Sequence, residues 1–169
     1  MVAVTVLGPN GASRTSTVEL RPGVAPRAER ALRLTVLVLE GVVAVAALGG
    51  GSAMVANPTD AMGLGPEMLD QLPVDSWLLP GVALIASNAV LPAAAAVGEL
   101  RRRRWPHRFG HTVVGAVVLA WPVTETALFG YPLEGEPVWL RPAIAATGAS
   151  IIVLGLLLRR RGASLPLGR

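Results

Sequence analysis

Three ionisable side chains lie inside long apolar stretches of this chain, where they are the first candidates for chemistry. Glu40, Glu125 and Arg141 are each surrounded mainly by aliphatic residues. Because burying a charge in an apolar medium is costly, such residues are functional candidates by default. A carboxylate in this setting can hold a proton or a cation, so Glu40 and Glu125 are the candidates for such a site.

Glu40 shares one face of a predicted helix with small residues. Ala44, Ala47 and Gly51 follow it at helical spacing, and small residues occur where membrane helices approach closely. This pattern predicts that Glu40 faces the interior of a helix bundle. Two interpretations of this residue follow, a proton or cation carboxylate or a Glu near the lipid headgroups, hydrated or paired with Arg33 or with the arginines at 101–104, and the sequence favours the second.

Glu125 and Arg141 are expected at similar depths on two helices joined by a short loop. The pattern favours a structural ion pair that clamps these helices, and an outward-facing site for a charged ligand is the alternative. Glu40 and Glu125 should lie near opposite ends of spans about 30 Å thick. Chemistry by a pair of close carboxylates is therefore not expected.

Asn88 is the polar residue nearest the middle of its apolar stretch, with Gly81, Pro92 and Ala95 on the same helical face. A mid-membrane amide usually bonds to a neighbouring helix, so we expect a cross-helix hydrogen bond, with substrate contact as the alternative. Pro92, like Pro122 in a later stretch, predicts a local bend, because proline removes a backbone hydrogen bond.

His107 and His111 stand four residues apart, a spacing that can hold a metal ion on a helix. The arginine cluster at 101–104 separates Glu99 from this pair along the sequence, and the chain has no Cys. The nearby arginines would also repel a cation. The sequence therefore predicts no metal site.

Catalytic motifs are missing from the sequence. The absence of Cys excludes disulfides, thiolate sites and iron–sulfur clusters, and the absence of Lys excludes a phosphate-binding loop of the Walker type. No Gly-x-Ser-x-Gly or His-Glu-x-x-His motif is found. We expect no catalytic residue, no cofactor and no enzyme activity.

The isoelectric point of about 11.2 could indicate nucleic-acid binding, but the seven aromatic residues do not interleave with the arginines, so no nucleic acid partner is expected.

Four apolar blocks must position these residues. Of the 169 residues, 52% are hydrophobic and only 15% are charged, whereas a soluble domain is about 25% charged. Since about 20 helical residues cross a bilayer core, each block is long enough to span. The sequence predicts an all-α fold, a membrane-embedded antiparallel four-helix bundle over residues 31–159. The predicted spans are 32–56, 77–100, 109–131 and 138–158.

The segments outside the blocks are predicted to be tails and loops. Residues 1–30 are rich in Gly, Pro, Ser and Thr, which predicts a disordered cytoplasmic tail, and residues 160–169 form a second, short one. Between the first two spans, Pro66 could begin a short helix that turns Met68, Leu69 and Leu72 to the membrane surface. An irregular loop is the alternative there.

The arginines are segregated along the chain. Fourteen of the 15 lie before or at the start of the first block, between the second and third, or after the fourth, and Arg141 is the exception. By the positive-inside rule this predicts a multi-pass protein of the plasma (cell) membrane with both termini cytoplasmic. Trp77, Tyr131 and Trp139 are then expected at the outer interface and Trp105 at the inner one. The candidate contacts to anionic lipid are Arg101, Arg102, Arg103 and Arg104.

The region from Leu39 to Leu84 carries a pattern of glycine and proline. It contains a Gly-Gly run, Asn57-Pro58, Gly63-Leu64-Gly65, a leucine-rich loop and Leu79-Pro80-Gly81. In this it resembles small uncharacterised four-helix integral membrane proteins of high-GC bacteria. The resemblance covers residues 30–158 and implies a fold and a location, without any activity or site residue.

Two functions follow from these features as expectations. The first is an integral membrane protein without catalytic chemistry, which acts through helix–helix or lipid interactions as a scaffold or accessory subunit. Its expected partners are membrane lipid and either further copies in a homo-oligomer or another membrane protein. The alternative is a small transporter or channel subunit that uses Glu40 or Glu125 as a proton or cation site.

Overall fold

The computed structural model describes residues 2–7, 13–18, 24–61, 66–101, 103, 105–130 and 137–163. The chain divides into two units, Met1–Leu32 and Arg33–Arg169, and the division falls within a helix.

The first unit contains a β-hairpin where the sequence predicts a disordered tail. Strand β1, Val2–Leu7, pairs antiparallel with β2, Ser13–Val18, so that Val2 lies opposite Val18. The structure thus has strands in part of the segment that the sequence predicts to be disordered. Both strands are rich in β-branched Val and Thr, which favour strands. The following helix also begins earlier than predicted, at Val24 rather than near residue 31.

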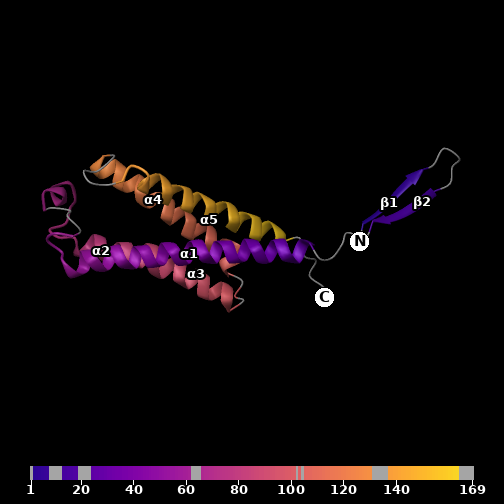
Figure 1. Cartoon of the computed structure of the whole chain (residues 1–169), viewed down its shortest axis with the longest axis horizontal. Helices are drawn as coiled ribbons and strands as arrows, with labels where there is room; N and C mark the ends of the chain where they lie inside the picture. Colours follow the sequence, from indigo (N-terminus) through magenta and orange to yellow (C-terminus); the bar gives the residue numbers. More distant parts are fainter. Residues whose placement is uncertain are drawn as a thin grey trace. The chain divides into compact units, whose positions relative to one another are not determined.

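The long helices of the described residues form four segments, seen in Figure 1. The first is α1, Val24–Ala56. The second is continuous from α2, Leu78–Leu84, through the π-helical η2, Ile85–Val90, to α3, Leu91–Leu100. A π-helical turn, η3, Pro106–Gly110, leads into α4, His111–Phe129, and α5 is Leu140–Ala163.

All four segments are long and apolar enough to cross a membrane, as judged by length and composition. The qualifying stretches are Arg27–Ala56, Leu78–Leu100, His111–Phe129 and Leu140–Arg161. This agrees with the predicted spans to within a few residues at most ends. The last helix continues to Ala163, into the segment predicted to be a tail.

Glycines mark the closest approaches between helices. A Cβ atom at Gly51 of α1 would lie 2.8 Å from the carbonyl oxygen of Gly81 in α2. A Cβ at Gly115 of α4 would lie 2.7 Å from the carbonyl oxygen of Gly148 in α5. Figure 1 shows α4 and α5 side by side, and α1 running along α2 and α3. The prediction that the small face of α1 is a packing face is confirmed at Gly51.

The second helical segment loses its regular α-helical hydrogen bonds in the middle, at η2. Pro92 lies at the start of α3, directly after this π-helical stretch. Because proline has no backbone N–H, the carbonyl one turn earlier, at Asn88, has no partner at the α-helical position. A π-helical turn is a common response to such a gap. The structure thus has a π-helical stretch directly before Pro92, where the sequence predicts a local bend.

Apolar side chains are exposed and ionisable side chains are buried in this bundle, the opposite of the distribution in a water-soluble bundle. On one face of α1, Val38, Val42, Val45 and Leu48 are each more than half exposed. The buried polar or charged side chains of the described residues are Glu40, Asn88, Glu99, His111 and Arg141. The large aliphatic residues thus face outward and several ionisable groups face inward.

A small apolar cluster closes the end of the bundle at which α1 ends and α2 begins. The 3₁₀ helix η1, Pro66–Gln71, places Leu69 against Met54, Ala61 and Trp77, and Met68 and Leu72 pack on the same cluster. The short helix at Pro66 is confirmed. Its apolar residues pack on the protein, where the sequence predicted contact with the membrane surface. Trp77 is also buried, at 3% exposure, because this loop covers it.

Candidate functional site

Four ionisable side chains from three helices lie next to one another, and we call them the ionic cluster: Arg33, Glu40, Glu99 and His111. His111 Nδ1 lies 2.7 Å from Glu40 Oε1, within hydrogen-bond distance. On the other side of the ring, His111 Nε2 lies 3.6 Å from Glu99 Oε2. Arg33 Nη1 donates to Glu99 Oε1 at 3.2 Å. The cluster therefore connects α1, α3 and α4.

Helix geometry explains why these residues meet. Arg33 and Glu40 are seven residues apart on α1, so they lie on one face two turns apart. Glu99 is the penultimate residue of α3 and His111 is the first of α4. The connection between these helices is tight, since Arg103 N donates to Gly98 O at 2.8 Å. The end of one helix is thereby held beside the start of the next.

The cluster is closed by protein atoms at its centre. The side chains of Glu40 and His111 are both 0% exposed and that of Glu99 is 3% exposed, whereas Arg33 is 40% exposed. Glu40 Oε2 is buried and has no hydrogen-bond partner among the described residues. The ionic cluster thus extends from the fully buried side chain of Glu40 to the partly exposed side chain of Arg33.

The arrangement suits proton binding better than metal binding. A neutral imidazole donates from only one ring nitrogen, while the imidazolium form can donate from both, and here the two nitrogens face different carboxylates. With an imidazolium, the four groups would carry alternating charges that sum to zero. Within the part of the chain that the structure describes, no group of three or more His, Asp or Glu residues is placed to share a metal ion.

The sequence located part of this site. Its expectation that Glu40 faces the interior is confirmed. The alternative pairing of Glu40 with Arg33 is wrong, because Arg33 bonds Glu99. The inference that the arginine cluster keeps Glu99 away from the histidines is also wrong, because the tight turn after α3 returns the chain. The side chain of His107 lies outside the described residues.

A signal for the missed residues was present in the sequence. Glu99 and His111 flank the arginine segment on either side, which is where two helices joined by a short connection must come together. A carboxylate and an imidazole at the facing ends of such helices are natural partners. The separation of Glu99 and His111 along the chain is therefore a poor guide to their separation in space.

Glu125 and Arg141 lie close together, and each also bonds other groups. Arg141 Nε is 3.9 Å from Glu125 Oε2. Arg141 Nη1 donates to the carbonyl oxygen of Gly130 at 2.7 Å and to Thr126 Oγ1 at 3.1 Å. Glu125 Oε1 accepts a 2.7 Å bond from Trp121 Nε1. Arg141 of α5 therefore lies within ion-pair distance of the predicted partner Glu125 and also bonds residues at and just after the end of α4.

Asn88 is buried, but its described hydrogen bond is local. Asn88 Nδ2 donates to Ser87 Oγ at 2.8 Å, and Ser87 Oγ donates to Ala83 O at 2.6 Å. The cross-helix bond predicted for this amide is not among the bonds of the described residues. The π-helical turn η2 explains the difference, because it displaces the side chains from regular helical positions.

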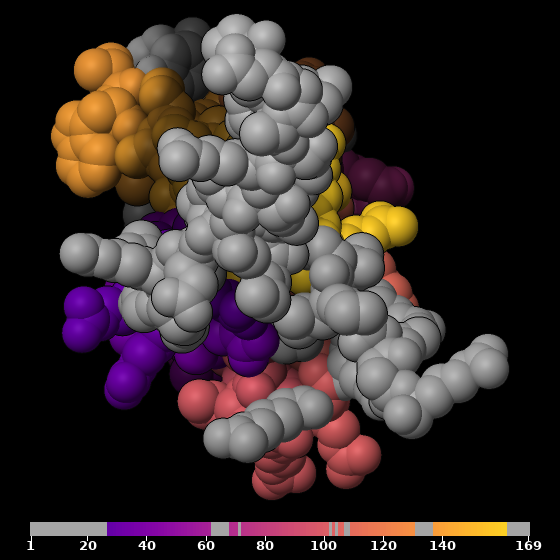
Figure 2. All heavy atoms as spheres, turned by 90° about the vertical axis from the view of Figure 1, so that its right-hand side faces the viewer, coloured from indigo at the N-terminus to yellow at the C-terminus, as the bar shows by residue number. Residues whose placement is uncertain are grey.

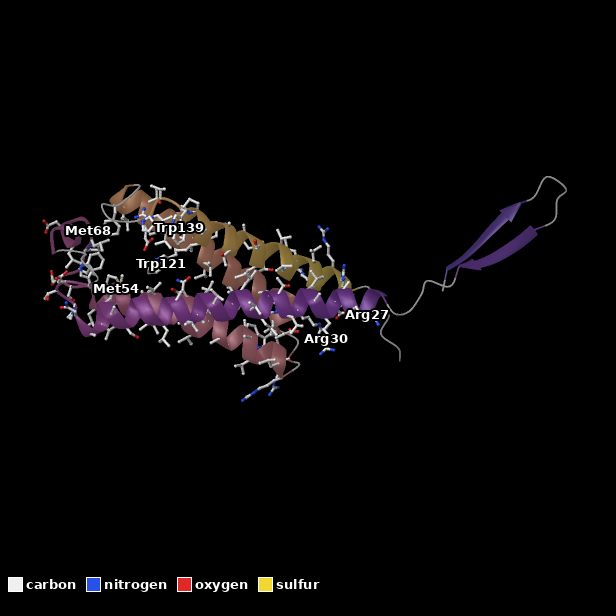
Figure 3. The ribbon with its side chains drawn as sticks, viewed as in Figure 1. Arg27, Arg30, Met54, Met68, Trp121 and Trp139 are labelled. Atoms are coloured by element: carbon white, nitrogen blue, oxygen red, sulfur yellow. The ribbon has the colours of Figure 1, made fainter. Side chains whose placement is uncertain are left out.

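A cavity of about 430 Å³ lies between α1, η1, the second helical segment and α4. Its walls are largely apolar and include Met54, Trp77 and Trp121, with Glu125 as its charged residue. Figure 3 shows Met54, Met68 and Trp121, three of its lining residues, at the same end of the helices. Ser87 lines this cavity and Asn88 does not. The ionic cluster is not part of it.

Exposed arginines gather where α3 and α5 end. Figure 2 looks onto this end, where the side chains at both helix ends reach the surface. Arg101 and Arg103, just after α3, are exposed, as are Arg159, Arg160 and Arg161 of α5. Arg102 and Arg104 of the predicted lipid-contact set lie outside the described residues. Two of the three arginine segments of the sequence, both in this second unit, therefore share one end of the bundle.

No protein-family model matches the chain, and comparisons with curated proteins and with solved structures find no significant match.

Proposed function

We propose that this chain is a multi-pass integral membrane protein without catalytic chemistry, which acts as a scaffold or accessory subunit through contacts with lipids and partner helices. The observation that carries the proposal is the inverted polarity of the bundle. Val38 and Val45 of α1 are 63% and 73% exposed, while Glu40 on its other face is fully buried. In water, a continuous apolar surface of this kind would cause aggregation, whereas lipid solvates it.

Contacts between helices support an antiparallel, membrane-embedded bundle. Early residues of α1 meet late residues of the second segment, as Arg33 meets Glu99. Late residues of α1 meet early residues of that segment, as Gly51 meets Gly81. The same crossing pattern joins α4 and α5. Spans connected in this way alternate in direction, and this would place the arginine segments on one side, with both termini in the cytoplasm.

The surroundings of Glu40 and Glu125 favour a scaffold over a transporter. Glu40 is enclosed by protein and does not line the cavity. The cavity that reaches Glu125 has mostly apolar walls, and a path for ions or protons needs polar groups or water along its length. The partners that suit these surfaces are membrane lipid and a second copy of the chain or another membrane protein.

Membrane topology can be tested with single cysteines, because the chain has none of its own. One pair of variants is Arg103→Cys and Arg160→Cys, and the other is Asp60→Cys and Trp139→Cys, all at exposed positions. In intact cells, a membrane-impermeant maleimide should label only the second pair. Both pairs should become reactive after the membrane is permeabilised. Labelling of the Arg103→Cys variant in intact cells, or release of the protein from membranes by alkaline carbonate, would contradict the proposal.

A second candidate function, a proton or cation site at Glu40, is favoured by the ionic cluster. Chains of Glu and His inside membrane proteins commonly carry protons, and this one reaches from Glu40 to the partly exposed Arg33. The test is proton uptake into vesicles that contain the purified protein, with Glu40→Gln as the comparison. Uptake that Glu40→Gln abolishes would favour this function, and uptake equal to that of empty vesicles would favour the scaffold.

A further inference from the structure

The cavity beside Trp77 and Trp121 has the dimensions of a single hydrocarbon chain. Its volume is about 430 Å³, which corresponds to roughly fourteen water-sized groups at about 30 Å³ each. Along α4 its lining extends from Val117 to Phe129, and twelve helical residues rise about 18 Å. The lining along α4 is therefore long enough for an extended chain, and the volume is that of a chain of about the same number of carbon atoms.

The walls of the cavity suit an apolar and flexible occupant. Met54 and Met68 contribute unbranched, polarisable side chains that adapt to irregular ligands. Trp77, Trp121 and Phe129 add flat aromatic surfaces. Ligand sites are typically lined in this way, with a few polar groups that orient the ligand.

Glu125 sets the chemistry at one end of the cavity. It lies one helical turn before the end of α4 at Phe129, and its side chain is 32% exposed. A carboxylate can accept about four hydrogen bonds, so it can accept one from a ligand in addition to the bond from Trp121. Arg141 at 3.9 Å already balances its charge. A neutral donor fits this environment better than an ammonium group, and a second carboxylate would be repelled.

We propose that this cavity binds a membrane lipid with one hydrocarbon chain and a neutral hydroxyl headgroup, with the chain along α4 and the hydroxyl donating to Glu125. The inference rests on the proposed membrane location, because such a ligand would enter from the lipid phase. The polar end would then lie near the end of the span and the chain deeper in the bundle.

Tryptophan fluorescence provides the test, since two of the four tryptophans line the cavity. The purified protein would be reconstituted in phosphatidylcholine vesicles and titrated with a long-chain alcohol dibrominated at mid-chain, whose bromine atoms quench nearby indoles. The amine and the carboxylic acid of equal chain length serve as matched probes. Saturable quenching that is strongest for the alcohol, and that is reduced in Trp77→Phe and Trp121→Phe but not in Trp105→Phe, supports the proposal.

Substitution of one alanine of α4 can fill the cavity, and substitution of another serves as the control. Ala120 lines the cavity, whereas Ala116, one turn earlier and also exposed, does not. Ala120→Phe should raise the midpoint of quenching by at least about tenfold, and Ala116→Phe should leave it unchanged. Glu125→Gln should retain binding of the alcohol and relax the discrimination against the acid, because it removes the charge and keeps an acceptor.

The outcomes separate this inference from the proposed function. Protein that fails to float with the vesicles would overturn both. Protein that floats but shows no saturable quenching, or equal quenching in Ala120→Phe and Ala116→Phe, would overturn the lipid site alone. A preference for the acid or the amine over the alcohol would overturn the assignment of the headgroup.

Discussion

Among the single residues, His111 is the one that links three helices, because its two ring nitrogens face carboxyl groups on α1 and α3. It lies between Glu40 of α1 and Glu99 of α3, and all three side chains are almost completely buried. A buried charge is costly unless partners surround it. The cluster supplies such partners from several helices at once, so removal of one member leaves the others with the full cost of burial.

Replacement of His111 by Ala should therefore destabilise the helical unit strongly. Loss of one partner of a buried pair costs about 3–5 kcal/mol, while Glu40→Gln, which keeps the size and an acceptor, should cost about 1 kcal/mol. The measurement is the free energy of unfolding in mixed detergent micelles. Ser150→Ala is the control, since Ser150 is exposed and bonds only Ala146 of its own helix among the described contacts.

The double variant decides whether Glu40 and His111 act as a pair. In Glu40→Gln/His111→Ala, the cost should be smaller than the sum of the two single costs by about 0.5–3 kcal/mol. Strict additivity would show that the 2.7 Å contact between these side chains contributes nothing to stability.

Arg141 should stabilise the protein mainly through the end of α4. Its short bonds go to Gly130 O and Thr126 Oγ1, and Glu125 lies farther away at 3.9 Å. Arg141→Ala should cost about 2 kcal/mol, because it removes the hydrogen bonds to Gly130 O and Thr126 Oγ1, each of which contributes about 1 kcal/mol. Adding Glu125→Gln should recover less than about 1 kcal/mol. Recovery of most of the loss, measured by the same unfolding assay, would instead identify the Arg141–Glu125 pair as the main contact.

Between helices, glycine positions determine how closely the segments pack. Gly51 and Gly81 allow α1 and α2 to meet at backbone distance, and Gly115 and Gly148 do the same for α4 and α5. Gly49 belongs to the same glycine run as Gly51, yet a Cβ there would meet nothing within 4 Å. Composition cannot separate these two residues, but their positions around the helix do.

This difference gives a matched pair of substitutions. Gly51→Ala should destabilise the unit by about 1–3 kcal/mol, because the new methyl group would overlap Ile85 and the backbone of Gly81. Gly49→Ala should stabilise it by up to about 1 kcal/mol, since alanine is the better helix former. Equal effects of the two changes on unfolding would show that α1 and α2 do not pack through Gly51.

Across the molecule as a whole, exposed basic and acidic residues are separated between the two ends of the helices. Exposed arginines follow α3 and end α5, while Asp60, Asp70 and Asp75 lie in or beside the connection between α1 and α2. The net charge of +4 conceals this separation. Under the positive-inside rule, such separation sets the orientation of a membrane protein.

Replacement of the four arginines at 101–104 by serine should weaken the preference for one orientation in the membrane. We expect a fraction of the molecules to insert with the opposite topology, because the loop between the second and third spans would lose four of its five basic residues. The single-cysteine assay at Trp139 measures this as a loss of labelling in intact cells. Replacement of the arginines at 159–161 is the comparison. Unchanged labelling in both would show that other features fix the topology.

The amino-acid sequence was sufficient to predict the four helical segments and the inward direction of Glu40. Both depend on local properties, namely the length of apolar runs and the spacing of small residues around a helix. It also located Glu125 and Arg141 at neighbouring positions, because a short connection leaves little freedom in how two helices pair.

The meeting of the charged groups and the position of the cavity became visible only in the folded chain. Glu99 and His111 are twelve residues apart, and Glu40 is 71 residues from His111, so their contact depends on how three helices pack and on the turn after α3. The cavity likewise has walls from α1, η1, α2 and α4. Such features depend on distances between elements that are remote in sequence, and no local pattern of residues specifies those distances.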